Sequence, residues 1–122
     1  MARIFPTRRR STLALRQRKA ALLGQIAIRP DLLRASFVER YGQCGKANCR
    51  CRQGHKHGPF FYLTQCLAAG QVKKFLLKEP EQQQRAQRGI AHFNQLYEML
   101  EELSQINSEL LRRNEPLEEQ AG

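Results

Sequence analysis

The chain has 122 residues, of which 41% are hydrophobic and 26% charged, and its formal net charge is +10. This length allows one domain and excludes two independent hydrophobic cores. The excess of positive charge favours a polyanionic partner such as DNA, RNA or an anionic membrane surface. The charge is uneven, because residues 1–58 hold 14 Lys and Arg against 2 Asp and Glu, whereas residues 59–122 hold 7 against 9.

The N-terminus gives the expected compartment. Met1–Arg10 is basic and no sufficiently long apolar segment follows it, so we expect no secretory signal. No window approaches the roughly eighteen apolar residues of a membrane span. Because the first acidic residue is Asp31, an Arg-rich organellar transit peptide is the alternative. We predict a cytoplasmic protein, in which a reducing environment keeps the four cysteines as thiols.

The N-terminal part is predicted to form an arm and a helix. Residues 1–10 contain four arginines and no obvious packing residue, so we expect a basic flexible arm. Ser11 or Thr12 can cap a helix over residues 11–28. The helix should end before Pro30, since the residue preceding a proline avoids the helical region.

The middle of the chain is predicted to form a small antiparallel sheet. Residues 36–41 alternate as a strand, and Phe60–Leu67 with Val72–Leu77 form a hairpin that places Gly70 in the left-handed region. Pro80 starts a long helix. The expected class is α+β. We expect a flexible arm (1–10), one zinc-stabilised domain (11–114) and an acidic tail (115–122). The domain is expected to contain a helix (11–28), then a strand, zinc loop and hairpin (36–78), and a long helix (80–114).

Six residues of the long helix recur at spacings of three and four, as in a heptad seam. One interpretation is a helix that packs against the first helix and the sheet. The other is a homodimer seam in which the single asparagine fixes the register. The predicted seam is Phe93, Leu96, Leu100, Leu103, Asn107 and Leu110.

The segment from Cys44 to Pro59 has the spacing Cys-x4-Cys-x-Cys-x5-His. Thiolates and neutral imidazole suit Zn²⁺, and four protein ligands make a closed structural site. His55 could replace His57 or support it through a hydrogen bond. The alternatives are a metal-free glycine loop with free thiols, or a redox or other metal site, while Cys66 is most simply a core thiol. The predicted zinc ligands are Cys44, Cys49, Cys51 and His57.

No acidic residue lies between Arg40 and Lys78. A surface with one sign of charge suits phosphates, and counterion release supplies the affinity. An ordinary solvated basic surface is the competing interpretation. The predicted nucleic-acid contacts are Arg8, Arg9, Arg10, Arg40, Lys46, Arg50, Arg52, Lys56, Lys73 and Lys74, with Lys78 in the same acid-free stretch.

The same acid-free stretch contains three consecutive aromatic residues, Phe60, Phe61 and Tyr62. Their rings could stack on nucleic-acid bases. Because Phe60 and Tyr62 share one face of a strand and Phe61 the other, at least one face must be core. We favour core packing for these rings, with Tyr62 as the exception because its hydroxyl tolerates an exposed rim.

No catalytic constellation is present in the sequence. Asp31 and Glu39 are the only carboxylates before Glu79, so no paired-carboxylate site forms near the histidines. A nucleophile pair could be drawn from Cys51 and His55, but thiols crowded among other ligands are better explained as ligands. We therefore expect a protein that is not an enzyme.

The blocks Cys-Gly-Lys-Ala-Asn-Cys-Arg-Cys and His-Gly-Pro-Phe-Phe-Tyr-Leu, followed by a hairpin and a charged helix, carry a resemblance. They resemble an uncharacterised family of short prokaryotic proteins associated with transposases or mobile elements. The resemblance spans roughly Ala35 to Arg113, and its cysteine block falls on metal positions expected for that family. It implies a mobile-element context and a metal, and no particular activity.

Together these features predict a zinc-stabilised nucleic-acid-binding accessory or regulatory protein of a mobile element, which forms a homodimer. The expected partners are nucleic acid, DNA more than RNA, and a transposase or recombinase, with no membrane. The alternative is a protein-interaction adaptor that docks on such a partner through the long C-terminal helix.

Overall fold

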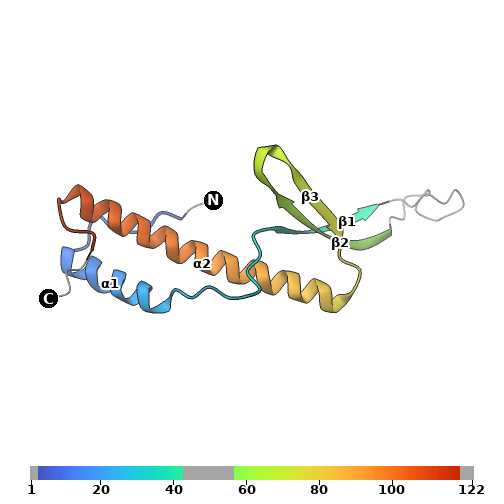
Figure 1. The fold of residues 1–122 in the computed structure, drawn as a ribbon, viewed down its shortest axis with the longest axis horizontal. Helices are drawn as coiled ribbons and strands as arrows, with labels where there is room; N and C mark the ends of the chain where they lie inside the picture. Colours follow the sequence, from blue (N-terminus) through green and yellow to red (C-terminus); the bar gives the residue numbers. More distant parts are fainter. Residues whose placement is uncertain (1–2, 43–56, 119–122) are drawn as a thin grey trace, which may run out of the picture. The chain divides into compact units, whose positions relative to one another are not determined.

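The computed structural model describes residues 3–42 and 57–118 (Figure 1). It confirms the predicted α+β class, with an N-terminal helix, a three-stranded antiparallel sheet and a long C-terminal helix. None of the helices in this part of the chain combines the length and apolarity needed to cross a membrane. The elements in chain order are α1 (Thr12–Gln25), β1 (Ser36–Gly42), β2 (His57–Cys66), a 3-10 turn (Ala68–Gly70), β3 (Val72–Leu76) and α2 (Pro80–Arg112).

The chain divides into two compact units, and α2 contributes to both. We call Met1–Arg29 with Asn94–Gly122 the helical unit, and Pro30–Phe93 the sheet unit. The helical unit contains α1 and the C-terminal part of α2. The sheet unit contains the three strands and the start of α2.

The sheet has the order β1-β2-β3, with β2 in the centre. Phe37 pairs with Leu63, and Leu63 pairs with Phe75, so these three side chains share one face. That face holds the core of the sheet unit, because Leu63 is buried there in one cluster with Leu77 and Ala86. The partly buried side chains around this cluster are Leu33, Ala35, Phe37, Phe61 and Ile90.

A close backbone contact also joins α2 to the segment that precedes β1. The Leu33 N–H donates to the Gly89 carbonyl over 3.1 Å. A Cβ atom at Gly89 would lie only 2.4 Å from the Asp31 carbonyl oxygen. Nearby, His92 Nδ1 lies 2.7 Å from a carboxylate oxygen of Asp31. Gly89 is therefore required for this crossing, although its position inside a helix is otherwise unfavourable.

The hairpin turn confirms the left-handed conformation predicted for Gly70, whose φ is +73°. Ala69 adopts the same region, with φ of +60° and ψ of 33°. The Leu67 N–H closes the turn by donating to the Gln71 carbonyl over 2.6 Å.

The helical unit is built where α1 packs along the C-terminal part of α2 (Figure 1). Ser11 caps α1, since its Oγ accepts from the Ala14 N–H over 3.1 Å. The fully buried side chains are Leu15 and Leu22 from α1 and Ile106 and Leu110 from α2, with Met99 and Leu103 packed against them.

Two residues of the predicted seam, Leu103 and Leu110, thus contribute to packing within the chain. Leu100, by contrast, is 46% exposed. The Asn107 Oδ1 is buried without a hydrogen-bond partner among the described residues. The contacts of Leu103 and Leu110 correspond to the first interpretation of the heptad pattern, a helix that packs against α1.

Residues 3–10 differ from the arm without packing residues that the sequence suggested. Phe5 is buried, and its N–H donates to Gln105 Oε1 over 2.8 Å. The Arg113 guanidinium donates to the carbonyls of Arg8 and Arg10 over 3.1 and 2.7 Å. The Phe5 ring and the hydrogen bonds between backbone groups of this segment and the side chains of Gln105 and Arg113 therefore hold it against the rest of the helical unit.

Candidate nucleic-acid interface

Most of the predicted zinc site falls on residues that the structure does not describe. Cys44, Cys49 and Cys51 lie outside the described residues, as do His55 and the basic residues Lys46, Arg50, Arg52 and Lys56. His57 is the first residue of β2 and pairs with Gly42 at the end of β1. Within residues 3–42 and 57–118, no group of three or more His, Cys, Asp or Glu could hold a metal ion.

Next to His57, Gly58 allows two strands to approach closely. Its φ is +143°, and a Cβ atom there would lie 2.6 Å from Tyr41 Cδ1 and 3.0 Å from the Arg40 carbonyl oxygen. Only glycine adopts this conformation without strain. The Tyr41 hydroxyl donates to Glu39 Oε1 over 2.9 Å, and this hydrogen bond to a carboxylate raises the pKa of Tyr41.

The sheet has a second face, opposite the core, which we call the open sheet face. Successive side chains of a strand alternate between faces, so the neighbours of Leu63 point away from the core. The cross-strand pairs Val38–Tyr62, Arg40–Phe60 and Thr64–Lys74 all lie on this face. Its members are Ser36, Val38, Arg40, Phe60, Tyr62, Thr64, Cys66, Val72, Lys74 and Leu76, and none of them is acidic.

The open sheet face combines aromatic rings with cations. Phe60 is 39% exposed and Tyr62 is half-buried. The Lys74 ammonium lies over the Tyr62 ring, 4.7 Å from its centroid. Core packing was expected for these rings, and it holds for the face of Phe61 and Leu63 but not for exposed Phe60.

Lys73 and Lys74, predicted as joint phosphate contacts, point to opposite faces. Lys73 pairs with Gln65, and its ammonium lies 5.7 Å from the centroid of the Phe75 ring. Phe75 belongs to the core face and is partly exposed. Only Lys74 therefore joins Arg40 on the open sheet face.

The predicted contacts Arg8, Arg9 and Arg10 belong to the helical unit, and their side chains are exposed. Cys66, expected as a core thiol, is instead exposed at the end of β2. Its carbonyl accepts from Arg34 Nη2 over 2.7 Å. The physical reason is its parity along β2, which places it on the face opposite Leu63.

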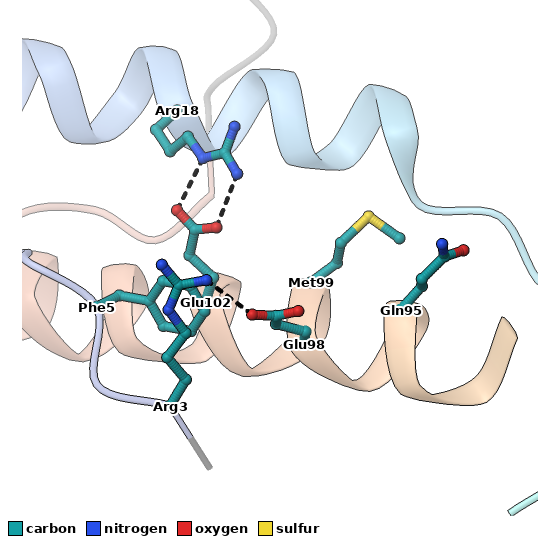
Figure 2. Close-up of a pocket in the computed structure, with 7 residues that line it drawn as sticks. All are labelled: Arg3, Phe5, Arg18, Gln95, Glu98, Met99 and Glu102. Carbon is teal, nitrogen blue, oxygen red and sulfur yellow. Dashed lines mark hydrogen bonds and ion pairs between the residues drawn. The ribbon is translucent and has the colours of Figure 1, made fainter. Parts of the chain in front are cut away.

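A cavity of about 350 Å³ lies in the helical unit (Figure 2). There Arg18 Nε and Nη2 donate to the two oxygens of Glu102 over 2.7 and 2.8 Å, and Arg3 Nη1 donates to Glu98 over 2.9 Å. The Arg18 hydrogen bonds lower the pKa of Glu102. Each guanidinium faces a carboxylate of the same unit. We therefore interpret these ion pairs as structural contacts that join α1, α2 and the N-terminal segment around the cavity. Its lining is Arg3, Phe5, Arg18, Gln95, Glu98, Met99 and Glu102.

Val38, Val72 and Leu76 are parts of the interface that no sequence pattern singled out. They lie on the open sheet face, and Val72 is 59% exposed. Counting alternate positions from Tyr62 along β2, and then across to the neighbouring strands, would have found them once the register was known.

One comparison with known proteins gave a match. A family model described as a domain of unknown function (DUF6788) matches residues 12–87, which include α1, the three strands and the start of α2. The comparisons with curated proteins and with solved structures found no match. The family description names no activity, ligand or partner.

Proposed function

We propose, for a chain that belongs to the DUF6788 family, a role as a zinc-stabilised nucleic-acid-binding accessory or regulatory protein. The observation that carries this proposal is the open sheet face, where Arg40 and Lys74 lie among apolar and aromatic side chains without any acidic neighbour on that face. Such a surface attracts phosphates and releases their counterions. The exposed arginines at 8–10 add positive charge elsewhere on the chain.

The proposed zinc ligands are Cys44, Cys49, Cys51 and His57. The pairing of Gly42 with His57 supports this set, because it places His57 beside the end of β1, and Cys44 follows Gly42 by two residues in the sequence. Three thiolates and one imidazole suit a closed structural Zn²⁺ site. A cytoplasmic setting would keep these thiols reduced.

The biological context of the proposal comes from the sequence resemblance to mobile-element proteins. On that basis DNA is the expected polymer, and a transposase or recombinase is the expected protein partner. A homodimer through the seam that includes Leu100 and Asn107 is part of the same proposal. We propose no catalytic role for the chain.

An electrophoretic shift assay over a range of salt concentrations tests nucleic-acid binding. We expect affinity to fall steeply with salt, since each neutralised phosphate contributes a slope of about −0.9. Arg40→Glu with Lys74→Glu should lower the affinity by about tenfold or more and make the slope shallower. Arg85→Glu with Arg88→Glu is the matched control, because both arginines are exposed on α2 and the change in charge is the same. Absence of binding at low salt would refute the proposal.

The metal is tested separately, on protein purified without added zinc. We expect about one zinc per chain and its loss in Cys49→Ser, since a structural site needs all four ligands. Near-zero zinc, with a fold that chelators leave unchanged, would remove zinc from the proposal and leave the salt experiment unaffected.

The second candidate function is a protein-interaction adaptor. The observation that favours it is the exposure of large apolar side chains on α2, with Tyr97 and Leu100 both close to half exposed. The charge reversals at Arg40 and Lys74 separate the two functions. An adaptor that docks through α2 would keep its partner binding in that variant, whereas a nucleic-acid binder would lose its ligand.

A further inference from the structure

We infer that the open sheet face binds single-stranded nucleic acid, with bases stacked on Phe60 and Tyr62. This inference rests on the proposed function and narrows its ligand. The two rings lie two positions apart on β2, which places them on the same face and about 7 Å apart along the strand. They form a row of two stacking surfaces on the central strand of the sheet.

Each ring has a cation beside it. Arg40 is the cross-strand partner of Phe60. The Lys74 ammonium lies 4.7 Å from the Tyr62 centroid. Single-strand binders combine aromatic platforms for the bases with positive charge for the backbone. The open sheet face provides both on neighbouring strands, and none of its members is acidic.

The rings favour a single strand over a duplex. In a duplex the faces of the bases are covered by their neighbours in the stack, so an aromatic side chain cannot reach them without unstacking. Unpaired bases expose those faces and stack on aromatic side chains. A duplex could use only Arg40 and Lys74, through its phosphates.

Lys74 must move when a base stacks on Tyr62, because its ammonium lies over the ring. Lys74 is exposed, so its flexible side chain is able to swing away. A cation–π contact at an exposed site is weaker than base stacking on an aromatic ring. The displaced ammonium then becomes available for a phosphate, so one side chain covers the ring in the free protein and binds the backbone in the complex.

The apolar members of the face could also suit a protein, since Val72 is 59% exposed and Val38 is half-buried. Charge complementarity favours nucleic acid over an apolar protein surface. Arg40 and Lys74 have no carboxylate partner within the described residues, and a purely apolar protein surface would leave both cations buried without compensation.

The test compares a fluorescently labelled single strand of about 20 nucleotides with the duplex of the same sequence, by anisotropy on the full chain. We expect the single strand to bind at least about tenfold more tightly. Phe60→Leu and Tyr62→Leu keep the apolar volume and remove the ring, so each should lose about tenfold affinity for the single strand and keep its duplex affinity. Tyr62→Phe keeps the ring and should bind within about twofold of the wild type.

Tyrosine emission gives a second measurement, because the chain has three tyrosines and no tryptophan. Stacking should quench the emission of Tyr62 when the single strand binds. In Tyr62→Phe the quenching should shrink although the affinity is kept, which a purely structural role for this residue would not produce. Thermal unfolding of each variant checks that the fold is retained.

Equal affinity for single strand and duplex, or an unchanged affinity in Tyr62→Leu, would overturn the inference while the proposed function stands. Binding of neither polymer at low salt would overturn both. A protein ligand that binds this face, when neither nucleic-acid polymer binds the chain, would also overturn both the inference and the proposed function.

Discussion

The two units hold α2 by different means. In the sheet unit the contacts are mainly apolar, with Leu63 and Ala86 in one cluster, and the backbone crosses closely at Gly89, where His92 also contacts Asp31. In the helical unit an apolar cluster is joined by charged side chains that are themselves buried, including Glu102 and Glu109. One continuous helix is thus stabilised mainly by apolar packing in its first part, and by apolar packing together with buried carboxylates in ion pairs in its second.

This difference shows where positive charge is available for a ligand. Arg18 and Arg113 are engaged by carboxylates of the helical unit, through Glu102 and Glu109. Arg40 and Lys74 make no ion pair with the described residues. Part of the positive charge of the helical unit is therefore already paired within that unit, whereas both cations of the open sheet face are available to phosphates.

The largest effect is expected in the apolar cluster of the helical unit. Leu110 is fully buried against α1, whereas Leu111 is 65% exposed. Leu110→Ala should lower the free energy of unfolding by about 3 kcal/mol, because it removes buried methyl groups and leaves a cavity. Leu111→Ala is the matched control and should change it by less than about 0.5 kcal/mol. Urea unfolding measures both.

The same experiment bears on the homodimer. If Leu110 acts through α1 within one chain, its effect should not depend on protein concentration. An effect that vanishes on dilution would instead assign this residue to an interface between two chains.

The second-largest effect on stability comes from glycine-to-alanine substitutions, which should act in opposite directions in the two units. Gly89→Ala in the sheet unit should destabilise by about 2 kcal/mol, because the new Cβ collides with the Asp31 carbonyl, a backbone atom that cannot easily move. Gly24→Ala in α1 has open space and should stabilise by roughly 0.5–1 kcal/mol through helix propensity. Opposite signs in urea unfolding are the expected result. A stabilising Gly89→Ala would show that the crossing relaxes.

Local patterns predicted the elements of the fold, and distant contacts explain what they missed. The two helix starts were marked by Ser11 and Pro80, and the hairpin turn by Gly70. Each of these signals acts within a few residues. Phe5 gave no such signal. Its partner Gln105 lies 100 positions away, so only the folded chain reveals that residues 3–10 have something to pack against.

The candidate site was predictable to a similar extent. Alternation separated Phe60 and Tyr62 from Phe61, but it did not say which set is core. The burial of Leu63 against Ala86 decides this, and it depends on how α2 covers the sheet. For the same reason, a run of basic residues placed Lys73 beside Lys74, although strand geometry separates them. The three cysteines of the proposed zinc site lie outside the described residues and stay a prediction.

The smallest effect is expected at Glu109, which forms ion pairs with Arg112 and Arg113 in the helical unit. Its carboxylate accepts from Arg112 Nη2 and Arg113 Nε, each over 2.7 Å. Hydrogen bonds from these two guanidinium groups lower the pKa of Glu109 to about 2. The charged form is therefore favoured in the folded chain relative to the unfolded chain, where the pKa of glutamate is about 4.3.

The sign of the pH dependence follows from this lowered pKa. A carboxylate whose pKa is depressed by folding contributes stability above its unfolded pKa and loses it as the pH falls toward the folded pKa. The wild type should therefore melt at a higher temperature than Glu109→Gln above about pH 4.3, and the difference should narrow as the pH falls to about 2. Glu98→Gln, which removes an exposed ion pair with Arg3, is the control and should give a smaller difference. Hydrogen exchange should place the loss of stability in the helical unit. A difference in melting temperature between wild type and Glu109→Gln that stays constant from pH 6 to 2 would show that the two arginines do not act through the charge of Glu109.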